Sequence, residues 1–176
     1  MYNVWIGSYN SGDQAQGQLT VTTSNTLTAV AGSGGAPLNP AGNPNFGARS
    51  LAAGFGAVTI DVTSGGNIEA RNSSAGSACR GYITAQPDVN VTLTTPVPSA
   101  RIFIDNARDN ADTTLVIQTP DGSYHCDDDT NGNSPQVDLS QATAGAYHIW
   151  VGSYQSGVQA HARLNITSGA AGAGGK

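Results

Sequence analysis

Charged residues are scarce in this chain of 176 residues. They make up 11% of it, Lys176 is the one lysine, Glu69 is the one glutamate, and the formal net charge is −5. Binding to nucleic acid needs clustered basic side chains that displace counterions from phosphates, and the arginines here are scattered along the chain. The composition therefore argues against nucleic acid as a partner.

The sequence also lacks long apolar runs. No stretch approaches the roughly 20 apolar residues that span a bilayer, so we expect no membrane span. Met1 is followed directly by strand-like sequence instead of a signal peptide. We therefore expect the N-terminus of the natural protein to lie upstream of this chain.

Helical periodicity is a third absence. No segment places apolar residues at i, i+3, i+4 and i+7 over three turns, and the many Gly, Thr and Val residues disfavour helix. Short runs with strand-like composition, separated by turn-forming residues, occur instead at 57–63, 68–72, 80–85, 89–95, 101–106 and 114–119. Short strands at this spacing predict an all-β sandwich.

Cysteine is limited to Cys79 and Cys126. Two cysteines fit a disulfide better than a metal site, which would want four soft ligands or additional histidines. Closing a loop of this length would stabilise the fold by roughly 4 kcal/mol in the chain-entropy model. The pair predicts an oxidising, extracellular environment.

An internal repeat is the clearest pattern in the sequence. Residues 2–9 (YNVWIGSY) match residues 147–154 (YHIWVGSY), and the match continues to residues 19–22 and 164–167. Each copy alternates apolar and polar residues on both sides of a turn, which predicts one β-hairpin present twice, with Trp5 and Trp150 as core anchors. The apolar and aromatic residues assigned to assembly in the first copy are Tyr2, Val4, Trp5, Tyr9, Leu19 and Val21.

Glycine and proline between the two copies suggest the domain boundaries. We assign residues 1–31 to the N-terminal hairpin, 32–47 to a Gly/Pro linker, 48–169 to the sandwich and 170–176 to a Gly/Ala tail. Three arrangements of the first hairpin stay open. It closes an upstream repeat, packs on its own domain, or is donated to a neighbouring molecule, which would join chains into filaments.

Two stretches carry a family resemblance. Residues 113–129 (TTLVIQTPDGSYHCDDD) and 145–154 (GAYHIWVGSY), with Cys79-Arg-Gly-Tyr82, resemble the bacterial pre-peptidase C-terminal domains, and the likeness covers about residues 55–168. The resemblance implies an antiparallel jelly-roll-like β-sandwich, here with an additional N-terminal β-hairpin. It also implies an exported accessory module without chemistry of its own, bound to calcium in some members.

Acidic residues gather in two loops. Asp127, Asp128 and Asp129 are adjacent, and strand alternation puts Asp127 and Asp129 on one side. Calcium takes six to eight oxygen ligands and would offset their repulsion, with Asp112 of the other loop as a third ligand. The alternative is that these are solvated turn residues that cap their own backbone. The sequence leaves both open.

Catalytic groups form no motif. His125, His148 and His161 are expected on the surface, and we predict that the protein is not an enzyme. We expect a non-catalytic binding or spacer module of a secreted or surface bacterial protein, with other copies of itself or adjacent domains as partners. The alternative is a self-assembling filament subunit joined by the N-terminal hairpin.

Overall fold

The computed structural model describes residues 37–105 and 110–168. The predicted N-terminal hairpin, residues 1–31, and the predicted tail, residues 170–176, lie outside the described residues. So do the predicted assembly residues Tyr2, Val4, Trp5, Tyr9, Leu19 and Val21.

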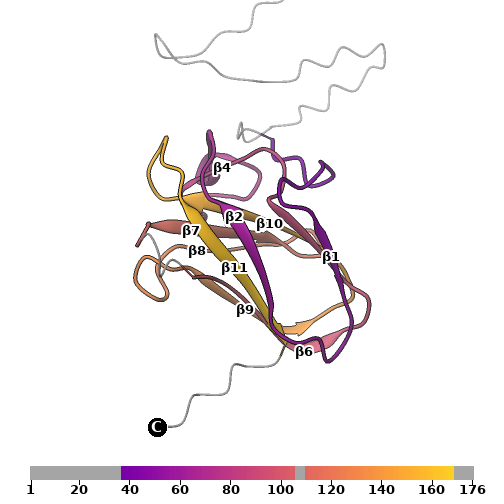
Figure 1. Ribbon diagram of the computed structural model, residues 1–176. Coiled ribbons are helices and arrows are strands. Elements are labelled where there is room, and N and C mark those ends of the chain that lie inside the picture. Colours follow the sequence, from indigo (N-terminus) through magenta and orange to yellow (C-terminus); the bar gives the residue numbers. More distant parts are fainter. Residues whose placement is uncertain (1–36, 106–109, 169–176) are drawn as a thin grey trace, which may run out of the picture.

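Two β-sheets stacked face to face form the described part of the protein (Figure 1). The strands are β1 (Ala48–Leu51), β2 (Val58–Thr63), β3 (Ile68–Glu69), β4 (Tyr82–Ile83), β5 (Val89–Leu93), β6 (Val97–Asp105), β7 (Thr113–Gln118), β8 (Tyr124–Asp127), β9 (Gln136–Ala142), β10 (Gly145–Ser153) and β11 (His161–Ser168). A single 3-10 turn, η1 (Ala70–Asn72), ends the strand expected over 68–72. The predicted all-β sandwich is confirmed.

The two sheets differ in size. The seven-stranded sheet runs β1-β5-β10-β4-β3, with β7 pairing the other side of β10 and β8 pairing β7. The four-stranded sheet has the order β2-β11-β6-β9. All pairs are antiparallel except β1 with β5, which is parallel, so the predicted antiparallel arrangement is wrong for this edge. No helix among the described residues has the length and apolar character needed to cross a membrane.

The main core lies between the sheets. Strand alternation turns Ile102 and Ile104 of β6 and Leu164 of β11 inward, against Ile149 and Val151 of β10. All five are at most 3% exposed. Burying a side chain of this size contributes about 1.5–3 kcal/mol, so this layer is a main source of stability.

A second, smaller core covers the outer face of the seven-stranded sheet. Trp150 of β10 and Val116 of β7 are fully buried there, under Leu38, Cys79 and Ile83. The prediction that Trp150 anchors a core is confirmed. Because this core sits opposite the first, residues 149–153 of β10 are buried on both faces.

Residues 37–47, the described part of the predicted linker, pack on the sandwich. Leu38 is buried in the second core, and the backbone N–H of Asn39 donates to the carbonyl of Ala85. The N–H groups of Asn45 and Phe46 donate to the carbonyls of Pro87 and Asp88. These residues thus differ from a free linker, because three of their backbone N–H groups donate to carbonyls of residues 85–88, which composition does not reveal.

The C-terminal copy of the repeat is a β-arch and not a β-hairpin. Strand β10 pairs with β5 and β7 in one sheet, whereas β11 pairs with β2 and β6 in the other. Figure 1 shows β11 beside β2 and β10 in the layer of β7. The hairpin prediction is wrong for residues 147–167, since alternation fixes the faces of a strand but not its neighbour.

Candidate functional site

The predicted disulfide joins the cover of the second core to the sheet. Cys79 follows η1, Cys126 lies in β8, and their Cα atoms are 5.3 Å apart. Tyr124, two residues before Cys126, places its ring 6.3 Å from that of Trp150, centroid to centroid. The disulfide prediction is confirmed, and the bond holds the segment between η1 and β4 against the sheet.

The acidic run follows the end of β8. One carboxylate oxygen from each of Asp127, Asp128 and Asp129 can be chosen so that all three lie within 4.8 Å of one another. Sequence reasoning selected Asp127 and Asp129 and left out Asp128. Alternation stops at Asp127, where the strand ends and a bend begins, so Asp128 joins the group.

Asp127 has a structural role within this group. Its carboxylate accepts hydrogen bonds from the backbone N–H of Thr130 at 3.1 Å, from the Thr130 hydroxyl at 2.9 Å and from the N–H of Gln136 at 2.8 Å. For this residue the structure supports the alternative that Asp caps its own loop.

The two acidic loops meet at one end of the sandwich. Burial raises the pKa of Asp112, and the negative charge of Asp129 raises it further. Burial also raises the pKa of Asp128, with further contributions from Asp129 and Asp127, while Arg80 opposes them. Asp112, Asp128 and Asp129 thus repel one another across the two loops. Their role as metal ligands stays a prediction.

Asp88 is a buried acid that sequence reasoning missed. It precedes β5 and is 1% exposed. Its carboxylate accepts hydrogen bonds from the Asn45 side chain at 2.8 Å and from the backbone N–H of Val151 in β10 at 2.7 Å. Burial raises its pKa to about 6, although these two hydrogen bonds lower it. Asp88 therefore ties residues 37–47 to the centre of the seven-stranded sheet.

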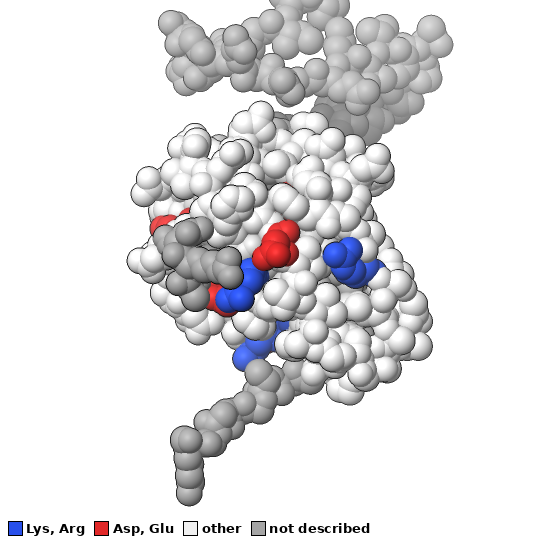
Figure 2. All heavy atoms as spheres, in the orientation of Figure 1, with Lys and Arg blue, Asp and Glu red and all other residues white. Residues whose placement is uncertain are grey.

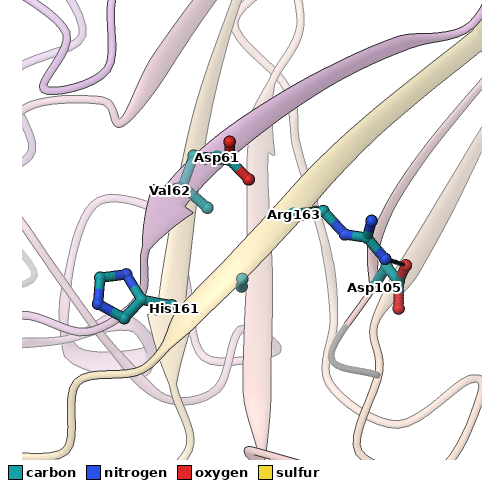
Figure 3. Close-up of a pocket in the computed structure, with 6 residues that line it drawn as sticks. Asp61, Val62, Asp105, His161 and Arg163 are labelled. Atoms are coloured by element: carbon teal, nitrogen blue, oxygen red, sulfur yellow. Dashed lines mark hydrogen bonds and ion pairs between the residues drawn. The ribbon is translucent and has the colours of Figure 1, made fainter. Parts of the chain in front are cut away.

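A cleft of about 210 Å³ lies on the outer face of the four-stranded sheet. Arg163 of β11 stands in register between Asp61 of β2 and Asp105 of β6, and it forms an ion pair with Asp105. Figure 3 shows His161 and Asp105 on opposite sides of Arg163. The cleft therefore presents a row of charged side chains, with the histidine at one end.

A second cleft, of about 220 Å³, lies between the β7–β8 turn and β9. Asp138 forms an ion pair with Arg101, at 2.6 Å between Nε and Oδ1. Asp121 accepts hydrogen bonds from the Thr119 hydroxyl and the Ser123 N–H, which lower its pKa. Both acids lining this cleft hold local structure together.

The face shown in Figure 2 carries few charges, set among uncharged atoms.

The three histidines, all expected on the surface, lie on three different strands. His125 is on β8, His148 on β10 and His161 on β11. His125 and His161 are exposed, as expected, whereas His148 is half-buried with its Nδ1 2.9 Å from the Asn90 side-chain oxygen. Burial lowers the pKa of His148. The first two fit the surface prediction and the third departs from it.

Comparisons with known proteins give structural likenesses. No family model and no curated protein matches the chain. Among solved structures, the pre-peptidase C-terminal domain of collagenase from Bacillus anthracis is 15% identical, with 72% of this chain and 98% of that chain covered and a TM-score of 0.41. The chain is similar to a pre-peptidase C-terminal domain.

A second solved structure is of a different protein. PliG of Aeromonas hydrophila, a periplasmic lysozyme inhibitor of g-type lysozyme, is 13% identical. The match covers 68% of this chain and 96% of that chain, with a TM-score of 0.38.

Proposed function

We propose that this chain is a non-catalytic binding or spacer module of a secreted or cell-surface protein, stabilised by calcium. The observation that carries the proposal is the Cys79–Cys126 bond across the second core. Disulfides form and persist outside the cytoplasm, where they replace part of the stability that a small core lacks. A cross-linked sandwich suits a domain that must stay folded outside the cell.

The polar side chains of the two clefts support a structural role. Asp105 and Asp138 pair with arginines, and Asp121 fixes the β7–β8 turn. A general acid or base needs a proton-transfer partner within about 3 Å and a pKa suited to the task. Asp105, Asp121 and Asp138 are instead arranged to hold strands and turns, which favours a module over a hydrolase.

Calcium would bind where the two acidic loops meet. Asp112, Asp128 and Asp129 would supply carboxylate oxygens, and loop carbonyls would complete a shell of six to eight ligands. The raised pKa values of Asp112 and Asp128 fit this role, because burial and like charges disfavour the ionised form until a cation offsets them. Asp127 would hold the loop in shape through Thr130 and Gln136.

Thermal unfolding with and without calcium tests this site. We expect calcium to raise the unfolding midpoint of the wild-type chain relative to chelator, since a ligand that binds the folded state stabilises it. Asp128→Asn and Asp129→Asn should lose this shift. Asp61→Asn, an exposed acid of β2, is the matched control and should keep it. Equal shifts in all four proteins, or none in the wild type, would refute the calcium proposal.

Mass in solution separates the module from the filament hypothesis. A module should stay monomeric by light scattering at every concentration, with or without calcium. Polymers that grow with concentration and disappear when residues 1–31 are deleted would favour the filament instead.

A further inference from the structure

The surroundings of β10 and β11 in the sandwich require particular residue types at some positions, in addition to apolar side chains. We call this place, β10 between β5 and β7 together with β11 between β2 and β6, the arch position. A Cβ at Gly152 would come within 2.4 Å of the Thr114 hydroxyl oxygen and 2.9 Å of the Tyr82 carbonyl. Glycine is therefore required there.

Two further positions in this segment have requirements of their own. The Ser153 hydroxyl is buried 2.8 Å from the Ser64 hydroxyl, which also accepts the backbone N–H of Ala160. Gly157, in the connection between the strands, has a φ of 76°. A buried hydroxyl such as that of Ser153 needs a hydrogen-bond partner, and a backbone position with positive φ favours glycine.

Residues 2–22 meet all three requirements at the equivalent places. Gly7 stands at the position of Gly152, Ser8 at that of Ser153, and Gly12 at that of Gly157. An ordinary half-buried strand pair needs neither a glycine in the strand nor a serine on its buried face. The agreement therefore points to the same surroundings and not to strand formation alone.

The apolar positions agree in the same way. Trp5 stands at the position of Trp150, and Leu19 at that of Leu164, both fully buried in the arch. Residues 4 and 6 are Val and Ile, whereas residues 149 and 151 are Ile and Val. The summed volume of this pair is unchanged, and cores tolerate swaps that conserve volume.

Differences between the copies occur at exposed and at buried places of the arch. Val158, which is 40% exposed, corresponds to Asp13, and the exposed His161 corresponds to Gln16. At buried places the differences keep small or apolar residues, with Gly17 at the position of Ala162 and Val21 at that of Ile166.

We propose that residues 2–22 are a second copy of the arch, and that their binding partner is a sandwich of this same type with an open arch position. The chain carries two arch sequences, whereas the described sandwich has one arch position, filled by residues 147–167. Exchange between identical chains would replace one arch by its equivalent and gain no contacts. The partner is therefore a sandwich whose own closing strands are absent or displaced.

Neither calcium nor the disulfide is needed for residues 2–22 to bind in this way. A filament formed by such binding would be joined through the interior of the sheets. Strands β10 and β11 are central strands, each paired on both sides. Residues 2–22 would therefore insert into the middle of both sheets and would not extend an edge.

The chain length allows residues 2–22 to reach the arch position of their own sandwich as well. Residues 23–36 span up to about 46 Å when extended, at roughly 3.3 Å per residue. A nine-residue strand is about 30 Å long. Disabling the C-terminal arch should thus allow the N-terminal copy to take its place.

Matched substitutions in the full chain test this exchange. Leu164→Asp disables the C-terminal arch, Leu19→Asp disables its copy, and the double variant disables both. We expect Leu19→Asp to leave the thermal unfolding midpoint unchanged, Leu164→Asp to lower it while keeping a cooperative transition, and the double variant to lose that transition. The proposal is overturned if Leu164→Asp alone loses the transition, or if Leu19→Asp lowers the midpoint as much as Leu164→Asp does.

Tryptophan emission reports which copy is buried. In a Trp150→Phe background Trp5 is the one tryptophan. Adding Leu164→Asp should shift the emission maximum of Trp5 to shorter wavelength, because the indole moves into the second core. An unchanged maximum contradicts the exchange.

A mixing experiment tests the partner. The double variant offers an open arch position, and the wild-type chain offers residues 2–22. We expect mixing to restore a cooperative transition and to give a 1:1 complex by light scattering, whereas a Leu19→Asp chain should do neither. Complex formation with both donors, or with neither, would overturn the proposed partner.

Discussion

Asp88 shows how a single side chain connects parts of the chain that are distant in sequence. Its two oxygens bind Asn45, before β1, and the backbone of Val151, in the middle of β10. Sequence reasoning treats an aspartate after a proline as a turn residue, because nothing local indicates that its side chain points inward. Its burial is a product of tertiary packing.

Replacing Asp88 by Asn should change how stability depends on pH. The pKa of Asp88 rises from its ordinary value of 3.8 to about 6 in the folded protein, so the folded state holds the proton more tightly than the unfolded chain. The contribution of Asp88 to the free energy of unfolding therefore falls as the pH rises from about 4 to about 6. An asparagine at this position does not titrate. The free energy of unfolding of Asp88→Asn, measured relative to that of the wild type, should therefore rise by about 3 kcal/mol across this window.

Urea unfolding at several pH values between 4 and 7 measures this difference. His148, whose pKa is lowered by burial, titrates in both proteins and cancels in the comparison. Parallel curves for the two proteins would show that the Asp88 carboxyl is not perturbed by folding.

At the scale of elements, the contact of residues 64–67 with β4 leaves no room for a side chain. A Cβ on Gly66 would lie 2.0 Å from the Ile83 carbonyl carbon and 2.1 Å from its oxygen. Gly66→Ala should therefore force backbone movement and cost about 1–3 kcal/mol. Gly56→Ala is the control, since a Cβ at Gly56 meets nothing within 4 Å, and it should change stability by less than about 0.5 kcal/mol. Equal unfolding midpoints in denaturant would contradict this packing.

Strand positions could be predicted from the sequence better than strand partners. The bounds expected from alternation lie within a few residues of the observed bounds of β5 and β7. The burial of Trp150 follows from its place in such an alternating pattern. The arch was mistaken for a hairpin because alternation is a local property, whereas pairing with β7 or β2 depends on residues far away in sequence.

The local nature of sequence patterns also explains what could and could not be predicted for the acidic loops and the linker. The meeting of Asp112 with Asp129 was expected from the order of strands, but the inclusion of Asp128 depends on a bend after β8 that alternation does not show. For residues 37–47, glycine and proline indicated an irregular backbone correctly. The burial of Leu38 could not be predicted, because it depends on the second core.

For the whole molecule, the disulfide restrains the unfolded chain more than any local contact does. The bond links residues separated by 47 positions. Replacing both Cys79 and Cys126 by Ser should reduce the free energy of unfolding by roughly 4 kcal/mol, since the unfolded chain then regains the entropy of an open loop. Denaturant unfolding of the double variant measures this loss, and reduction of the wild type with a thiol should reproduce it. A loss well below 1 kcal/mol would mean that the second core holds without the bond.

The position of β11 also has a mechanical consequence. This last described strand pairs with β2 on one side and β6 on the other, through six registered residue pairs with each. Tension applied at its C-terminal end would act along the strand and load both ladders in shear at once, whereas an edge strand peels away one hydrogen bond at a time. A domain pulled from this end should resist extension until both ladders break together.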